Sequence, residues 1–451
     1  MTSTAIDNPA DWTHLPSPSS LRFARAMAAL PHSWLSVPAA AAAADTDLPS
    51  ARLRLALLAA AGVVTVRGVR YRIVLAPAAA IEPPPAEAIA NLADWYLRSI
   101  DAALNELGMS YGYWPTPAPP RRSAPQIEPP RFAEHDAAYT WLIEEEDNLL
   151  AVLRAAAAAR LDAHTWQLAV HLLQSWSFRG EYTHWEHTAR IALDAALAAG
   201  DRVGHAQALA YQARGFSQRG LTSRAEQLQL EALEIRELAS DRHGLAQSHN
   251  ALGMIAHRRD DLPSAIAHYR TCETLAEDCD YDIFAALARH NLADALRTQG
   301  HLAEAMELLE RTIAYYEEHG HPYAVGSTAQ ILADVLGLQG LTEEALAAAN
   351  AALARCALLS DNALLAWALR TVCGALARAG RTAEAIEAAR AAAVLFDSVR
   401  DPQRHAKVLD LAAGLYDGQG ETESAAELRA QAGELRAHLS DADDETEEPG
   451  T

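Results

Sequence analysis

The sequence has only one lysine, Lys407, among its 37 basic side chains. A Walker A phosphate loop needs a lysine between glycine and serine or threonine, and Lys407 does not stand in that setting, so this loop is excluded. Schiff-base chemistry on lysine is excluded everywhere except at that position. The cations of this protein are therefore almost all arginines.

Cysteine is also scarce, since the chain of 451 residues has only Cys272, Cys279, Cys356 and Cys373, without a C-x-x-C pair. This excludes a disulfide scaffold, and we expect reduced thiols on helices. No run of about 20 apolar residues occurs, and the N-terminus lacks a basic stretch followed by an apolar one. We therefore expect a cytoplasmic protein without membrane association.

Aromatic residues make up 6% of the chain, and β-branched residues are scarce outside residues 63–74. Half of the residues are hydrophobic, mostly alanine and leucine, which are strong helix formers. The net charge of −22 disfavours a broad basic face and hence nucleic acid as a partner. The composition predicts an all-α protein.

A 40-residue repeat runs through most of the chain. Turn glycines lie at Gly180, Gly220, Gly300, Gly340, Gly380 and Gly420, and Asp260 fills the missing place. Five residues after each turn stand Ala225, Ala265, Ala305, Ala345, Ala385 and Ala425, and seven residues before it Ala213, Gly253, Ala293, Ala333, Cys373 and Ala413. The first unit departs from this pattern with Trp185 and Leu173. The spacing predicts about seven helix pairs, with a turn inside each pair and small residues where its helices approach closely.

This pattern resembles tetratricopeptide repeats, with a period of 40 instead of 34 residues, over about residues 137–436. The resemblance implies a TPR-like α-solenoid, a right-handed superhelix whose concave groove is lined by the first helix of each pair.

The residues before the repeats do not follow the 40-residue pattern. Helical runs at 21–30 and 50–61 precede two β-branched runs around Gly68, which predict a hairpin and suggest a small winged-helix-like unit. One helix is predicted across residues 141–150. The predicted segments are 1–19 (disordered), 20–80 (degenerate winged-helix-like), 86–109 (connecting helix), 110–131 (Pro-rich linker), 132–436 (repeats) and 437–451 (acidic, disordered).

The order of these segments resembles the winged-helix and repeat half of AfsR-type regulators of actinomycetes, which are STAND signalling ATPases. The matching residues are Tyr71, Arg72, Trp95, Tyr96, Leu97, Phe132, Trp141, Leu142, Glu146, Asn148 and Leu149. The family's nucleotide-binding domain has no counterpart here, and Val74-Leu75 replaces the His-Asp that senses the nucleotide. We therefore expect no ATP switch and no cofactor.

Counting back from each turn at the offsets of the repeat family gives the side chains expected to face the groove. These are Gln207, Arg214, Asn250, His257, His290, Asp294, Arg297, Gln330, Asp334 and Arg370, together with Trp367 and Lys407. They form either a surface that binds a protein or peptide or a solvated polar face with local salt bridges.

Catalytic motifs are missing from the sequence: we find no nucleophile elbow, no H-E-x-x-H and no Gly-rich phosphate loop. His184 and His187 lack further metal ligands nearby, so no metal site is expected. The favoured function is a non-enzymatic regulatory scaffold that binds a protein or peptide, with homodimerisation left open. One alternative is a transcriptional regulator that contacts DNA through arginines of the winged helix, and another is an enzyme or small-molecule-binding protein that uses His290 and Asp294.

Overall fold

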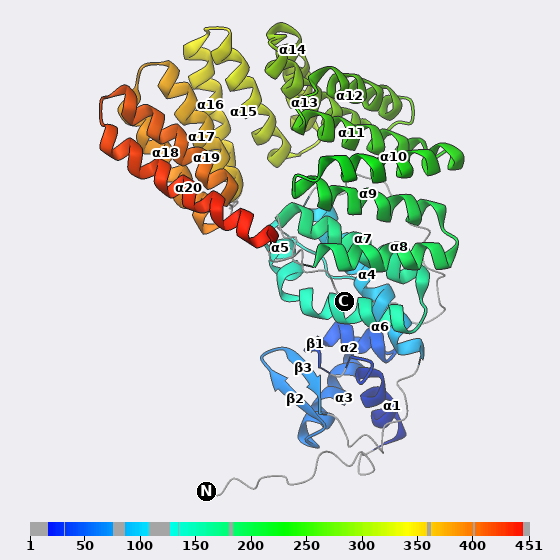
Figure 1. Ribbon diagram of the computed structural model, residues 1–451. Helices are drawn as coiled ribbons and strands as arrows, with labels where there is room; N and C mark the ends of the chain where they lie inside the picture. The colour runs from blue at the N-terminus through cyan, green and yellow to red at the C-terminus, as the bar shows by residue number, and fades with distance from the viewer. Residues whose placement is uncertain are drawn as a thin grey trace, which may run out of the picture. The chain divides into compact units, whose positions relative to one another are not determined.

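The computed structural model describes residues 17–30, 32–74, 86–107, 127–133, 135–179, 184–358, 362–399 and 402–444. These residues form twenty helices and three strands (Figure 1). The chain divides into two compact units, Met1–Ala251 (unit 1) and Leu252–Thr451 (unit 2).

Unit 1 begins with a small helix-and-hairpin region. Its elements are α1 (Pro18–Met27), β1 (Leu35–Ser36), α2 (Val37–Ala43), α3 (Leu48–Ala60), β2 (Val64–Arg67) and β3 (Arg70–Ile73). The predicted hairpin is confirmed, because β2 pairs antiparallel with β3. Strand β1 pairs with the other edge of β3 and gives the sheet order β1-β3-β2, which the sequence analysis missed because β1 has only two residues.

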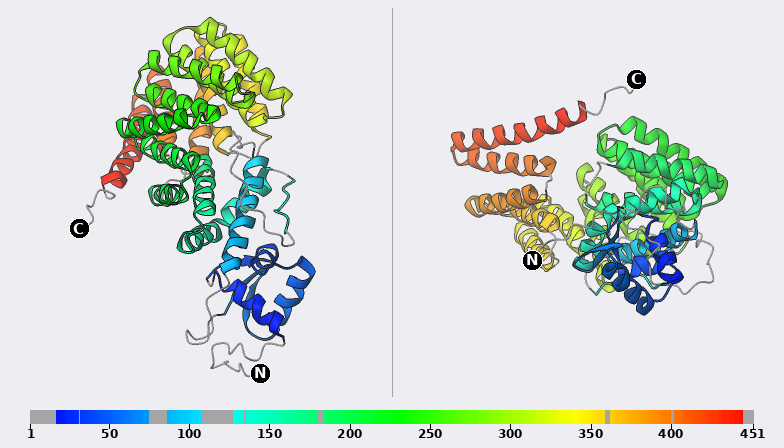
Figure 2. Two further views of the ribbon diagram at one scale, coloured as in Figure 1. Left: turned by 90° about the vertical axis from the view of Figure 1, so that its right-hand side faces the viewer. Right: turned by 90° about the horizontal axis from the view of Figure 1, so that it is seen from below.

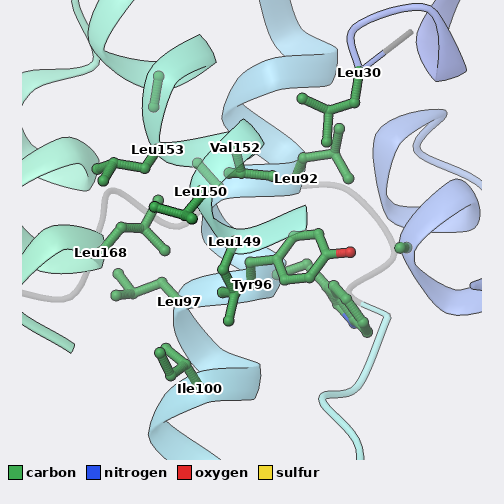
Figure 3. Packing of buried hydrophobic residues seen from close by; sticks show 14 of the residues in the cluster. Leu30, Leu92, Tyr96, Leu97, Ile100, Leu149, Leu150, Val152, Leu153 and Leu168 are labelled. Atoms are coloured by element: carbon green, nitrogen blue, oxygen red, sulfur yellow. The ribbon is translucent and has the colours of Figure 1, made fainter. Parts of the chain in front are cut away.

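The core of unit 1 surrounds α4 (Ala86–Glu106). Leu92, Leu97 and Ile100 belong to the same buried cluster as Leu149 and Leu168 (Figure 3). The helix predicted across residues 141–150 is wrong in one respect, since the structure divides it at Glu145 into α5 (His135–Glu144) and α6 (Glu146–Ala158). The end of the predicted linker contacts α4, where Trp95 Nε1 donates to the carbonyl of Glu128 at 3.3 Å.

Seven helix pairs follow within the described residues, as predicted. They are α7 (Asp162–Arg179) with α8 (Trp185–Ala199), α9 (Arg202–Gln218) with α10 (Thr222–Ala239), α11 (Arg242–Arg258) with α12 (Leu262–Glu277), α13 (Asp282–Gln299) with α14 (Leu302–Glu318), α15 (Pro322–Leu338) with α16 (Thr342–Cys356), α17 (Asn362–Arg378) with α18 (Thr382–Ser398), and α19 (Pro402–Gly418) with α20 (Thr422–Asp444). In unit 2, α15 to α20 lie side by side as antiparallel layers (Figure 2).

The turns between helices use left-handed backbone at twenty-residue spacing. Among the described residues from α6 onward, those with φ between 55° and 90° are Arg160, Gly200, Gly220, Ser240, Asp260, Asp280, Gly300, Gly320, Gly340, Gly380 and Gly420. Asp260 therefore replaces glycine as expected, at φ 61°. The turns between successive helix pairs have the same left-handed residue as the turns within a pair. Because Ser240 and Asp280 fill that place in two of them, the glycines of the sequence show a period of 40 residues and not of 20. Gly180 lies outside the described residues.

The predicted small residues lie where the helices meet. All eleven alanine and cysteine positions of the two sets are at most 1% exposed. At Gly253 an added Cβ would lie 2.6 Å from the ring of Tyr269, so glycine is required for the aromatic packing. In the first repeat unit, Trp185 replaces the small residue. Gly215 leaves space for its ring, because a Cβ at position 215 would lie 2.4 Å from it.

The C-terminal helix differs from its prediction. Helix α20 continues to Asp444 and so enters the segment from residue 437 that we expected to be disordered, while residues 445–451 lie outside the described part. Alanine, glutamate, leucine and arginine dominate α20, and these helix formers outweigh the acidic charge up to that point. The expected disorder at 1–16 and most of the linker also fall outside the described residues.

The four cysteines are free thiols, and Cys272, Cys356 and Cys373 are buried on helices. Cys279 is the exception to the expected helical placement, because it lies in the turn after α12. None of the helices in the described ranges combines the length and apolar character that crossing a membrane requires.

Candidate functional site

In unit 1, the first of the expected groove residues is part of a buried polar network. Gln207 is 3% exposed, and its Oε1 accepts a 2.7 Å hydrogen bond from the Arg236 guanidinium. Arg236, on α10 and 1% exposed, also donates to Ser248 Oγ at 2.6 Å. This network joins α9, α10 and α11, so Gln207 has a packing role that its place in the repeat did not reveal.

The remaining expected residues before α13 are divided between the two units. Arg214 is exposed on α9, whereas Asn250 is 7% exposed on α11. His257 is half-buried near the end of α11 and belongs to unit 2.

Unit 2 brings its expected residues together on α13, α15 and α17. On α13, Arg297 donates to Asp294 Oδ1 from Nε at 2.9 Å and from Nη2 at 2.7 Å. On α15, Asp334 accepts a 3.1 Å hydrogen bond from Nη2 of Arg378, a residue of α17. Arg370 lies about two helical turns before Arg378 on α17 and forms a 3.7 Å ion pair with the same aspartate. We call Asp294, Arg297, Asp334, Arg370 and Arg378 the arginine–aspartate cluster.

Arg378 lies outside the set of residues expected from the repeat offsets, although Gly337 is a sequence signal for it. A Cβ at position 337 would lie 2.3 Å from Arg378 Nε, so glycine leaves the space in which this guanidinium crosses α15 toward Asp334. Glycine inside a helix costs about 1 kcal/mol relative to alanine. A mid-helix glycine on the expected groove face therefore indicates that another side chain crosses there.

Trp367 supports Arg370 from the same helix. The Arg370 guanidinium carbon lies 4.7 Å from the centre of the Trp367 ring, and that of Arg404 on α19 lies 5.3 Å from it. Burial lowers the pKa of Arg370, and the opposing influence of Asp334 does not fully offset it. The charges of Arg297 and Asp294 also act on Arg370, which places the α13 pair near it.

His290 and Gln330 lie on the same helices as the cluster. Thr328 donates its hydroxyl proton to the carbonyl of Ala324 at 2.7 Å, so its oxygen accepts from Nδ1 of His290 at 2.9 Å. This assigns the Nδ1–H tautomer to His290. Gln330 is 5% exposed, and its Nε2 is buried without a hydrogen-bond partner in the described part of the chain.

The cluster has an excess of positive charge, with three arginines against two aspartates. Helix α17 contributes two arginines and has no acidic residue. The two acids of α19, Asp410 and Asp417, pair with Arg436 and Arg429 of α20. Nowhere in the described residues do three or more His, Cys, Asp or Glu side chains converge so that they could hold a metal ion.

The motif residues of the N-terminal third have a structural explanation. The Glu145 carboxylate, 1% exposed, accepts from Arg70 Nη1 at 2.6 Å, Tyr96 Oη at 2.8 Å and Asn148 Nδ2 at 2.6 Å. Burial and the Glu145 charge raise the pKa of Tyr96 well above its usual value, so its hydroxyl remains a donor. This network joins the hairpin to α4 and α6.

Comparison with known proteins agrees with this architecture. A tetratricopeptide-repeat family model matches residues 244–318. The regulatory protein AfsR of Streptomyces griseus is 27% identical over 186 residues, which are 41% of this chain and 19% of that regulator. The match thus spans less than a fifth of the length of its curated relative.

Among solved structures, aspartyl phosphate phosphatase F from Bacillus subtilis has a TM-score of 0.51 at 15% identity, covering 67% of this chain and 80% of that one. The Rap conjugation gene regulator of plasmid pLS20, in complex with the Phr* peptide, also has a TM-score of 0.51, at 14% identity over 66% of this chain and 79% of that one. Identities this low show the fold alone.

The fold is therefore a TPR-like α-solenoid. Within that class, residues 244–318 match a tetratricopeptide-repeat family, and part of the chain resembles an AfsR-type regulator.

Proposed function

We propose that this protein is a non-enzymatic regulatory scaffold that binds a protein or peptide partner through the first helices of unit 2. The observation that carries this proposal is the arginine–aspartate cluster, which gathers charged side chains of three successive repeats on one surface. Helical repeats offer such surfaces to extended partners. The similarity to a Rap regulator solved with a bound peptide supports the choice of ligand class.

The groove residues that could have served an enzyme have structural partners instead. The Asp294 carboxylate is held by Arg297, and His290 Nδ1 donates to Thr328. Burial also lowers the pKa of His290, which favours a neutral ring near neutral pH. These contacts favour binding over acid–base catalysis in the groove, and we propose a role without a chemical step.

A crosslinking and pull-down experiment on the full chain tests the scaffold. We expect wild-type protein to retain a defined partner from an extract of its own cells, and the Arg297→Ala/Arg370→Ala double variant to lose it. Arg224→Ala is the matched control, because Arg224 is an exposed arginine on α10 of unit 1 that donates to Gln227 on its own helix. If the double variant and the control retain the same partners equally, the binding surface lies elsewhere.

A second candidate function comes from charge and topology in residues 17–74. This region has seven arginines and two aspartates, although the whole chain carries −22. Its order of helices and strands, with the sheet order β1-β3-β2, supports the assignment of a winged-helix unit that contacts DNA. Arg52, Arg67 and Arg72 are exposed, whereas Arg70 is bound to Glu145. The exposed side chains of Leu53 and Leu57 on α3 disfavour DNA binding, because they cannot form hydrogen bonds with bases.

Fluorescence anisotropy of the full chain with a labelled DNA duplex tests this candidate. Each phosphate contact contributes about −0.9 to the slope of log K against log salt concentration. Loss of two contacts in Arg52→Ala/Arg67→Ala should therefore reduce the slope by about 2. If wild-type protein does not bind at low salt, or if the variant has the same slope, the DNA candidate is rejected.

A further inference from the structure

Arg370 has an incomplete set of partners in the arginine–aspartate cluster. A guanidinium carries five N–H donors. Within the described residues, Arg370 stacks on Trp367 and pairs with Asp334 at 3.7 Å, which is longer than a hydrogen bond. Its Nε is buried and has no hydrogen-bond acceptor there. The side chain is still 32% exposed, so a ligand can reach it.

The two aspartates of the cluster do not satisfy Arg370, because other arginines hold them more closely. Asp334 accepts the shorter contact from Arg378 at 3.1 Å, and Asp294 accepts two hydrogen bonds from Arg297. Trp367 and the packed helices limit access of water to one side of the guanidinium, in agreement with the lowered pKa of Arg370. A buried or half-buried donor without an acceptor is costly, and an anionic ligand would remove that cost.

We propose that this surface binds a carboxylate of a peptide or protein ligand, with Arg370 as the principal anion-binding side chain. The inference rests on the proposed scaffold function and specifies the chemistry of its ligand. The cluster has three arginines and two aspartates, and the Arg404 guanidinium lies over the same Trp367 ring as Arg370, so this surface has a net positive charge. A carboxylate offsets part of this charge, and its two oxygens match the parallel N–H donors of one guanidinium.

Trp367 completes the site. The Trp367 ring fixes the plane of the Arg370 guanidinium, which prepares it for two parallel hydrogen bonds to one carboxylate. The carboxylate itself comes either from a ligand's C-terminus or from an Asp or Glu side chain.

Affinity selection with three pools of synthetic hexapeptides tests the inference on the full chain. The first pool has a free C-terminal carboxylate and no acidic side chain. The second has an amidated C-terminus and one glutamate at a random position, and the third is amidated without any acid. Retained peptides are quantified by mass spectrometry for wild type, Arg370→Gln, Asp334→Asn and the control Arg224→Gln, and the thermal midpoint of each variant confirms folding.

We expect wild type to retain the first or the second pool in preference to the third, which also identifies the source of the carboxylate. Arg370→Gln should lower this retention about tenfold or more, as expected when a charge-assisted hydrogen bond is lost. Asp334→Asn should increase it, because it removes the acid that competes for Arg370, and Arg224→Gln should leave it unchanged.

Two outcomes separate this inference from the proposed function. Equal retention of all three pools, with Arg370→Gln equal to wild type, would overturn the carboxylate site while the scaffold function stands. Retention of no pool by wild type would overturn the carboxylate site together with peptide binding by this surface.

Discussion

Replacement of Gly253 by alanine tests the packing rule of the repeat directly. The new Cβ would lie 2.6 Å from Tyr269 Cε1, and the Tyr269 ring is 1% exposed and cannot swing into solvent. Overpacking of this kind costs about 1–3 kcal/mol, while alanine regains up to about 1 kcal/mol of helix propensity. We expect a net loss of about 1–2 kcal/mol, or a fall in Tm of several degrees at about 2–4 °C per kcal/mol.

The matched control is Gly414→Ala in α19, where an added Cβ meets nothing within 4 Å. There we expect stabilisation of about 0.5–1 kcal/mol from helix propensity alone. Tyr269→Leu combined with Gly253→Ala should destabilise by less than the sum of the two single changes, because the alanine then fills part of the space that the ring has left. Thermal and urea unfolding monitored by circular dichroism measure all four variants. Equal effects of Gly253→Ala and Gly414→Ala would refute the argument that close approach selects the small residue.

Three further predictions concern other parts of the molecule. Gln207→Ala removes an acceptor of the buried Arg236 guanidinium, and we expect a loss of about 1–3 kcal/mol in urea unfolding; no loss would show that the network does not stabilise unit 1. Glu145→Gln removes the buried charge that faces Arg70, whose side chain is 22% exposed, so we expect a loss of about 2–4 kcal/mol and a marked fall in Tm. Because burial lowers the pKa of His290, stability is lost as the pH falls through the ordinary value of 6.5, where the unfolded chain takes up the proton first. His290→Gln should therefore reduce the fall in the free energy of unfolding between about pH 7.5 and 5.5, by at most about 1.4 kcal/mol per pH unit, and an unchanged profile in urea unfolding would contradict this.

The regular part of the fold could be predicted because its physical causes are local. A residue with positive φ is needed wherever two helices meet in a tight turn, and glycine or aspartate marks these places in the sequence. The alternation of small and bulky residues reports directly on how closely the helices approach. Features without a local signature were missed, such as the two-residue strand β1 and the break between α5 and α6.

The sequence predicted which residues lie on the first helices of the repeats, but not which of them contact one another. The offsets placed Asp294, Asp334 and Arg370 on first helices, and the structure brings them together. Contacts between repeats decide the role of each residue, and the sequence does not display them. Arg378 reaches Asp334 across Gly337, whereas Gln207 is buried under Arg236.

Isothermal titration calorimetry with the best-retained hexapeptide tests the central claim most directly. The account predicts that Arg370→Gln raises Kd about tenfold or more, that Asp334→Asn lowers it, and that Arg224→Gln leaves it unchanged. Indistinguishable Kd values for wild type and Arg370→Gln, with both proteins folded, would contradict it.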